Sequence, residues 1–118
     1  VIMFNLTKVE DTKQLELPPI KEGEIYILKK DDTIVGYAII NQSSPNKVYF
    51  SILEKYRSNG YGNILFKLLK EKLKEKDYTS LTFTISRDNI PAQNIIVSQK
   101  GILVLNNSKG TTYTIYLK

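Results

Sequence analysis

Hydrophobic and polar residues alternate in several short stretches of the chain, and they recur at helical spacing in two longer ones. Alternation over four to eight residues predicts half-buried strands, whereas apolar residues at every third or fourth position predict an amphipathic helix. The pattern predicts strands over 2–6, 24–29, 34–40, 47–53, 80–86, 102–105 and 111–117. It predicts helices over 63–76 and from 89 to about 100. Short turns between the strands of 24–53 indicate an antiparallel meander.

The helix expected at 63–76 has one continuous apolar face, with lysines and glutamates opposite. Phe66 is expected at the edge of that face, which consists of Ile64, Leu65, Leu68, Leu69 and Leu73. Because this helix lies between two strands, it predicts a right-handed parallel crossover from 47–53 to 80–86. The second helix is expected to begin at an Asp88 or Asn89 cap, with Pro91 in its first turn, and to end at Gly101 as C-cap. The expected fold is α/β of the α+β kind: a mixed, mostly antiparallel sheet with two main helices and one β-α-β crossover.

The chain of 118 residues is expected to fold as one domain, 1–118, large enough to need neither metal nor disulfide for stability. No run of 18 apolar residues and no charged leader followed by an apolar run is present, so no membrane span is predicted and the cytoplasm is the expected location. Residues 7–23 are polar and contain Pro18-Pro19, which leaves room for at most a turn or two of helix.

Cysteine and histidine are both absent. This excludes disulfides, thiol nucleophiles, Ser-His dyads and metal sites that use Cys or His ligands, so a general base must be Asp, Glu, a shifted Lys or Tyr, or a water. The net charge is +5, but the lysines between Lys67 and Lys76 alternate with Glu71 and Glu75. Such alternation favours a solvated helix face over a nucleic-acid surface.

A glycine-containing loop, Arg57-Ser58-Asn59-Gly60-Tyr61-Gly62, separates the strand at 47–53 from the first helix. Glycines let the backbone turn sharply and leave its N–H groups accessible, and a helix N-terminus favours an anion. Arg57 adds a guanidinium that suits phosphate oxygens. The loop is therefore a candidate pyrophosphate cradle, although a tight turn alone would also explain the glycines. A Rossmann site is rejected, because a third glycine and a doubly wound sheet are lacking.

These residues resemble the signature Q/R-x-x-G-x-G/A of the GNAT superfamily of acyl-CoA-dependent N-acetyltransferases, filled here by Arg57, Gly60 and Gly62. A second feature of that family, N-x-x-A followed by apolar residues and a glycine, is similar to Asn89, Ala92 and the residues up to Gly101. The order of strands and helices also resembles the family order over roughly 24–118.

The resemblance implies transfer of an acetyl group from acetyl-CoA to a primary amine of a small molecule, a peptide or a protein lysine, without a metal. It also implies that a backbone N–H near the end of the central strand polarises the thioester carbonyl. The residues implied to bind CoA are Ile52, Leu53, Arg57, Ser58, Asn59, Gly60, Tyr61, Gly62, Asn63, Asn89 and Ala92.

Catalytic residues are less defined by the resemblance. Glu54 is the carboxylate nearest to the expected carbonyl position and is a candidate base, or else a solvated loop residue. The family often carries a tyrosine acid four residues after the alanine of N-x-x-A, where this chain has Ile96. Tyr49 or Tyr113 would have to substitute, or the thiolate leaves unassisted.

The short segment 7–23 is a second departure from the family, in which two helices form a wall of the acceptor site. Its brevity implies an open acceptor cleft, a wall from a partner subunit, or no acceptor chemistry. The alternative function is therefore a catalytically inactive GNAT-like domain that binds CoA or a protein partner. A homodimer and the identity of the amine stay open.

Overall fold

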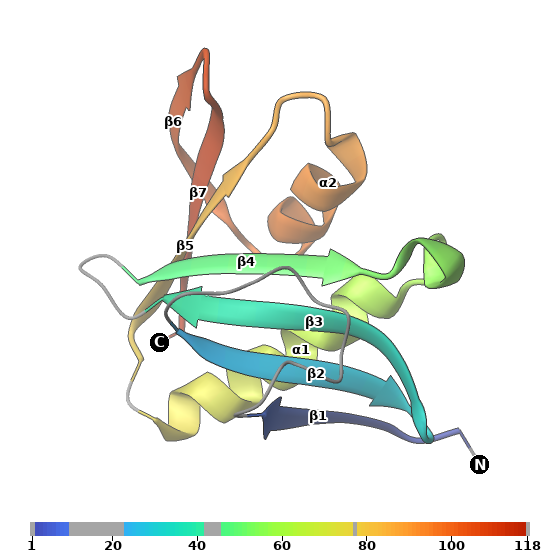
Figure 1. The fold of residues 1–118 in the computed structure, drawn as a ribbon. Coiled ribbons are helices and arrows are strands. Elements are labelled where there is room, and N and C mark those ends of the chain that lie inside the picture. The colour runs from blue at the N-terminus through green and yellow to red at the C-terminus, as the bar shows by residue number, and fades with distance from the viewer. Residues whose placement is uncertain (1, 10–22, 42–45, 77, 118) are drawn as a thin grey trace.

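The computed structural model describes residues 2–9, 23–41, 46–76 and 78–117, whose strands form one sheet flanked by helices (Figure 1). The fold class expected from the sequence is confirmed. In chain order the elements are β1 (Phe4–Val9), β2 (Glu24–Lys30), β3 (Thr33–Asn41), β4 (Lys47–Ile52), the 3₁₀ helix η1 (Glu54–Tyr56), α1 (Tyr61–Glu75), β5 (Ser80–Ile85), α2 (Ile90–Ser98), β6 (Ile102–Asn107) and β7 (Gly110–Tyr116).

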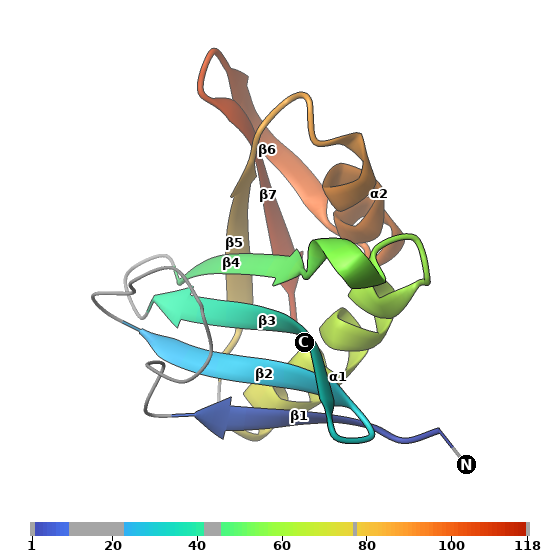
Figure 2. The same cartoon turned by 45° about the vertical axis from the view of Figure 1, so that its right-hand side comes forward.

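The strand order in the sheet is β1-β2-β3-β4-β5-β7-β6. Neighbouring strands run antiparallel except β4 and β5, which are parallel and joined through α1, as the sequence predicted. Figure 2 shows that β5, β7 and β6 are strongly rotated relative to β1 to β4. The rotation occurs at the parallel pair, which is therefore the place where the sheet opens.

Helix α1 packs its apolar face on the sheet through fully buried Leu65, Phe66, Leu69 and Leu73. The expected placement of Phe66 at the edge of that face is wrong. Its ring lies 4.7 Å from the ring of Phe50 and 5.2 Å from that of Phe83, measured between centroids, so it lies in the core between the two parallel strands. Ile64 and Leu68 are only half buried.

The ends of both helices differ from the prediction in detail. Helix α1 begins at Tyr61, two residues before the expected start, because Gly60 adopts a left-handed conformation (φ 78°) and serves as its N-cap. At the end of α2 it is Lys100, not Gly101, that adopts positive φ (67°). Gly101 is nevertheless required, because a Cβ there would lie 2.8 Å from the carbonyl oxygen of Ile96.

The first strand begins at Phe4, whereas the sequence predicted residues 2–6, and it extends to Val9. The prediction for 7–23 falls mostly on residues 10–22, which lie outside the described residues. Within the part of the chain that is described, neither helix has the length and apolar character needed to cross a membrane.

Candidate functional site

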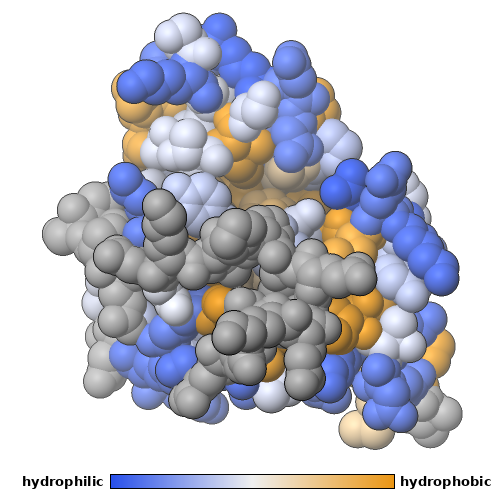
Figure 3. Space-filling view, viewed as in Figure 1, coloured by the Kyte–Doolittle hydropathy of each residue, from blue (hydrophilic) through white to orange (hydrophobic). Residues whose placement is uncertain are grey.

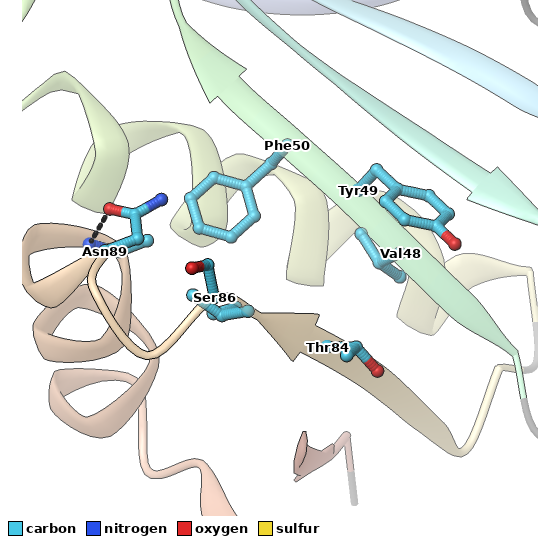
Figure 4. Close-up of a pocket in the computed structure, with 8 residues that line it drawn as sticks. Val48, Tyr49, Phe50, Thr84, Ser86 and Asn89 are labelled. Atoms are coloured by element: carbon cyan, nitrogen blue, oxygen red, sulfur yellow. Dashed lines mark hydrogen bonds between the residues drawn. The ribbon is translucent and has the colours of Figure 1, made fainter. Parts of the chain in front are cut away.

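The candidate site lies where β4 and β5 separate. Their pairing is limited to Lys47 with Thr82, next to a 2.8 Å hydrogen bond from the Thr82 N–H to the Asn46 carbonyl. Beyond that point the strands diverge, and a cavity of about 150 Å³ opens between them (Figure 4). The cavity is lined by Val48, Tyr49, Phe50, Thr84, Ile85, Ser86, Asn89 and Ala92.

Within the described strands, the edge of β4 that faces this gap has backbone groups that pair with no other strand. The N–H of Leu53 donates to the carbonyl of Val35 in β3 at 2.9 Å. Because N–H groups alternate in direction along an antiparallel strand, those of Phe50 and Ile52 point away from β3 and toward the gap. The two residues predicted at the strand end thus differ: Ile52 presents its N–H to the site, whereas Leu53 uses its N–H within the sheet.

Aromatic side chains close the inner end of the gap. Phe50, Phe66 and Phe83 form a cluster of edge-to-face and tilted rings, with Phe50 and Phe83 6.0 Å apart between centroids. Phe66 and Phe83 are fully buried, whereas Phe50 is half buried and lines the cavity. The Phe50 part of the cavity wall is therefore packed against the apolar core.

The glycine loop connects the end of β4 to α1. An added Cβ at Gly60 would meet no atom within 4 Å, so this position opens to solvent. Among the residues that the structure describes, no side chain caps the N-terminus of α1, so its first backbone N–H groups are available to an anion. Ser58 also adopts positive φ (67°). The geometry is that of an uncapped helix N-terminus behind an open loop.

Gly62 has a different role from Gly60. An added Cβ at Gly62 would lie 2.5 Å from Cδ1 of Ile95, so the glycine permits the close approach of α1 and α2. The two glycines of the predicted signature are thus distinct: one leaves space outside the loop, and the other allows two helices to pack.

Arg57 and Asn59 hold the loop in place. Nε of Arg57 donates to the carbonyl of Ile52 at 2.9 Å, and Nδ2 of Asn59 donates to the carbonyls of Tyr56 at 3.0 Å and Arg57 at 3.2 Å. The sequence predicted phosphate contact for Arg57 but missed this anchoring role. No local signal identifies it, since the partner is a backbone carbonyl.

The rim of the loop is cationic. Nζ of Lys30 lies 5.6 Å from the ring centroid of Tyr61, and Nζ of Lys55 lies 5.7 Å from that of Tyr56. Side-chain hydrogen bonding to Tyr61 raises the pKa of Lys30. Two ammonium groups thus flank the loop that leads into α1, as an anionic ligand would require.

The N-terminus of α2 forms the other side of the site. Oδ1 of Asn89 accepts from the Ala92 N–H at 3.3 Å, which confirms Asn89 as the helix cap. Figure 4 shows Asn89, Ser86 and the ring of Phe50 close together, with Tyr49 and Thr84 further along their strands. The structure thus brings Asn89 and Ala92 to the same cavity as the end of β4.

The three catalytic candidates lie in different surroundings. Tyr49 lines the cavity and is 54% exposed, and Glu54 is exposed at the start of η1. Tyr113 is buried on β7, where its hydroxyl donates to Oε1 of Gln93 at 3.3 Å, and it is not among the cavity residues. Ile96 is fully buried.

Thr84 and Ser86 also line the cavity, and sequence reasoning did not select them. Thr84 is on β5 and Ser86 directly follows that strand, so the available signal was the alternation of polar residues at the end of β5. Among the described residues, no group of three or more carboxylates suits a metal ion.

The model of the acetyltransferase (GNAT) family matches residues 4–97. The ribosomal-protein-S18-alanine N-acetyltransferase from Escherichia coli superposes with a TM-score of 0.76 at 14% identity, over 98% of this chain and 95% of that one. A domain from Methanocaldococcus jannaschii gives the same score and identity, over 98% and 99% of the two chains.

A structure of yncA from Salmonella typhimurium with its cofactor acetyl-CoA superposes with a TM-score of 0.69 at 12% identity, over 81% of this chain and 65% of that one. Identities this low show a shared fold. Among curated proteins, none matches the sequence.

Proposed function

Because the chain belongs to the GNAT family of acetyltransferases, we propose that it transfers an acetyl group from acetyl-CoA to a primary amine. The observation that carries this proposal is the divergence of β4 from β5, which opens a cavity between the uncapped N-terminus of α1 and the N-terminus of α2. The acceptor would be a small molecule, a peptide or a protein lysine.

The loop has features that fit the pyrophosphate of CoA. Gly60 leaves the approach to the α1 N-terminus free of a side chain, and no side chain of the described residues caps the first backbone N–H groups of that helix. Lys30 and Lys55 add positive charge at the rim. The pyrophosphate would therefore be held mainly by backbone donors, with cationic side chains around it.

The exposed edge of β4 fits the pantetheine arm, which carries two amide groups. The N–H groups of Phe50 and Ile52 point into the gap and could pair with such amides as a neighbouring strand would. Asn89 and Ala92 border the opposite side. One of these two N–H groups is the candidate donor to the thioester oxygen. The Leu53 N–H is not, because it already donates to the carbonyl of Val35 in β3.

Acetyl-CoA supplies the activated acyl group: the amine nitrogen bonds to the thioester carbonyl carbon, and the C–S bond breaks to release the CoA thiolate. The chain must then accept the proton of the amine and stabilise the thiolate. Glu54 is a candidate for the first task directly or through a water. Tyr49, which lines the cavity, is a better placed proton donor than Tyr113, whose hydroxyl is bonded to Gln93.

The second candidate function is a GNAT-like domain that binds CoA or a partner without turnover. It is favoured by buried Ile96 at the position where the family often has a tyrosine, and by the exposure of Glu54. Acetyl transfer and CoA binding without turnover require the same donor site, so binding and turnover must be measured separately.

The test starts with calorimetric titration of acetyl-CoA into wild type, Gly60→Asn and Gly60→Asp. The two variants have the same size and the same backbone strain at φ 78°, but only Asp adds a negative charge. We expect binding by wild type, a small loss in the Asn variant and a further loss of at least about tenfold in the Asp variant, or ~1.4 kcal/mol.

Release of CoA thiol is then followed with a panel of amines, and the absence of cysteine means that the chain adds no background to a thiol reagent. Turnover with any amine supports the acetyltransferase, whereas binding without turnover on all of them supports the second function. A folded wild type that does not bind acetyl-CoA would contradict acetyl transfer and CoA binding alike, and would leave only the binding of a partner.

A further inference from the structure

Strand β6 is an edge of the sheet, and within the described chain its outer side has no strand partner. Four consecutive apolar residues on it are each more than half exposed: Ile102 (53%), Leu103 (51%), Val104 (54%) and Leu105 (53%). In Figure 3 apolar surface lies at the upper left, where Figure 1 places β6. We call these four residues the β6 patch.

Sheet edges in proteins are normally protected by charged residues or proline, because unpaired strands associate. No charged residue and no proline occurs between Ile102 and Asn107. The opposite edge, β1, differs, since it exposes Asn5, Thr7 and Lys8. A run of exposed apolar side chains within an edge strand therefore occurs in β6 and not in β1, where the exposed Ile2 and Met3 precede the strand.

Exposed apolar residues continue onto the elements beside β6. Val97 on α2 is 56% exposed, and Tyr116 on β7 is 62% exposed. Leu103 lies opposite Tyr113 in the β6–β7 ladder and Ile102 lies opposite Thr114, so neighbouring residues of the patch occupy both faces of the sheet. A partner strand added at this edge would cover apolar side chains on each face.

We propose that the β6 patch is the interface with a second copy of this chain, whose β6 pairs antiparallel with the first. In a register centred between Leu103 and Val104, Ile102 lies opposite Leu105 of the second copy, and Lys100 lies opposite Asn107. Every apolar residue then meets an apolar residue, and no lysine meets a lysine. The strand is therefore complementary to itself.

The irregularity of β6 agrees with this pairing. A register shift between Leu103 and Leu105 places Leu105 opposite Thr112, while Ile102 lies opposite Thr114. Thr112 and Thr114 are two residues apart on β7 and share one face, so Ile102 and Leu105 share that face as well. A two-fold axis perpendicular to the sheet keeps each face on its own side, and it therefore brings Ile102 of one copy beside Leu105 of the other.

Partners of other chemistry fit less well. Lys100 and Lys109 at the two ends of β6 could pair with the carboxylates of an acidic partner. Such a partner would, however, bury charged groups against the four apolar residues between the two lysines, which is unfavourable. A second copy buries those four residues against the same residues of the first copy. The backbone N–H and C=O groups of the two β6 edges then hydrogen-bond to each other in a two-fold symmetric interface.

The first test is the oligomeric state of the whole chain, measured by sedimentation velocity over a concentration series. We expect a concentration-dependent dimer that tightens at higher salt, because both copies carry a net charge of +5 and salt screens their repulsion. Leu103→Lys places two ammonium groups near the two-fold axis and should raise the dimer dissociation constant at least tenfold. Thr7→Lys adds the same charge at the β1 edge and should leave the dimer unchanged.

The second test does not depend on the stability of the lysine variant. The chain has no cysteine, so Leu103→Cys introduces a single thiol close to the proposed axis, and mild oxidation should link two copies. Thr7→Cys is the matched control and should stay unlinked. A monomeric wild type at all concentrations, a dimer that Leu103→Lys leaves intact, or equal cross-linking of both thiols would overturn the proposal. None of these outcomes depends on acetyl-CoA.

Discussion

Nε of Arg57 donates a 2.9 Å hydrogen bond to the carbonyl oxygen of Ile52, and this bond joins the glycine loop to the last residue of β4. The backbone of Ile52 thus has two functions. Its N–H points into the gap between β4 and β5, and its carbonyl fixes the loop that leads into α1. The side chain of Arg57 therefore couples the two halves of the proposed donor site.

The first prediction separates hydrogen bonding by Arg57 from its charge. Arg57→Ala removes both, and we expect the dissociation constant for acetyl-CoA to rise about tenfold, or ~1.4 kcal/mol. Arg57→Gln keeps a side-chain donor that can reach a carbonyl without the charge, so its loss should be smaller. Calorimetric titration checks this, with Lys109→Ala as a control that removes an exposed cation from the β6–β7 turn. Equal binding by wild type and Arg57→Ala would contradict the coupling.

A second prediction concerns the contact of α1 with α2. Gly62→Ala places a Cβ 2.5 Å from Cδ1 of Ile95, so the free energy of unfolding should fall by about 1–3 kcal/mol. Ile95→Val removes that Cδ1 and costs about 0.5–1.5 kcal/mol alone. In the double variant the clash is absent, so the two losses should not add, with a coupling energy of about 1 kcal/mol. Urea unfolding of the four proteins tests this, and strictly additive losses would show that the side chain moves aside freely.

The regular elements could be predicted because their signals are local. The apolar repeat of Leu65, Leu69 and Leu73 defines the buried face of α1 within three turns, and the alternation of Leu81, Phe83 and Ile85 defines that of β5. The cap of α2 could be narrowed to Asp88 or Asn89 from their positions before Pro91, and the structure has Asn89 there. The glycine loop could be placed between β4 and α1 because its glycines interrupt the apolar pattern of the strand before the helical pattern begins.

The contacts that build the site could not be predicted, because they join residues far apart in the chain. Gly62 and Ile95 are neighbours only once α1 and α2 pack on the same side of the sheet. Phe66 lies in the core because β4 and β5 diverge above it, and no pattern within the helix indicates that divergence. Lys100 takes the left-handed position at the end of α2, although Gly101 is the better residue for it, because Gly101 is needed for close approach to Ile96.

A third prediction concerns the pH dependence of stability. Glu24 accepts from the Tyr26 hydroxyl at 2.8 Å and from Nζ of Lys76 at 3.3 Å. Burial raises the pKa of Glu24, but these hydrogen bonds and the charges of Lys76 and Lys8 lower it more, so it lies below the ordinary value of 4.5. A depressed pKa stabilises the fold above the unfolded value, and that contribution is lost as the pH falls through the folded pKa.

Glu24→Gln should therefore lower the free energy of unfolding by about 1–2 kcal/mol at pH 7 and make it less dependent on pH below about 4.5. Thermal unfolding between pH 3 and pH 7 measures both effects. Glu71→Gln, on the exposed face of α1, is the control and should leave the curve close to that of wild type. A Glu24→Gln curve parallel to that of wild type over the whole range would show that this carboxylate does not contribute to acid sensitivity.

The last prediction compares the two candidate tyrosines. Tyr49 lines the cavity between β4 and β5, so Tyr49→Phe removes a hydroxyl that can protonate the CoA thiolate, and we expect kcat to fall by about tenfold to a hundredfold. Tyr113 bonds to Gln93 beneath α2, so Tyr113→Phe should leave kcat within about threefold of wild type while lowering stability by about 1 kcal/mol. Turnover of acetyl-CoA with an amine that the panel identifies, together with urea unfolding, measures both.

If Tyr49→Phe keeps the wild-type kcat and its pH profile, the thiolate takes its proton from water and the tyrosine only shapes the cavity wall. If Tyr113→Phe instead loses activity at unchanged stability, Tyr113 on β7 is the proton donor. The amine would then have to approach the thioester from the side of the cavity on which α2 lies.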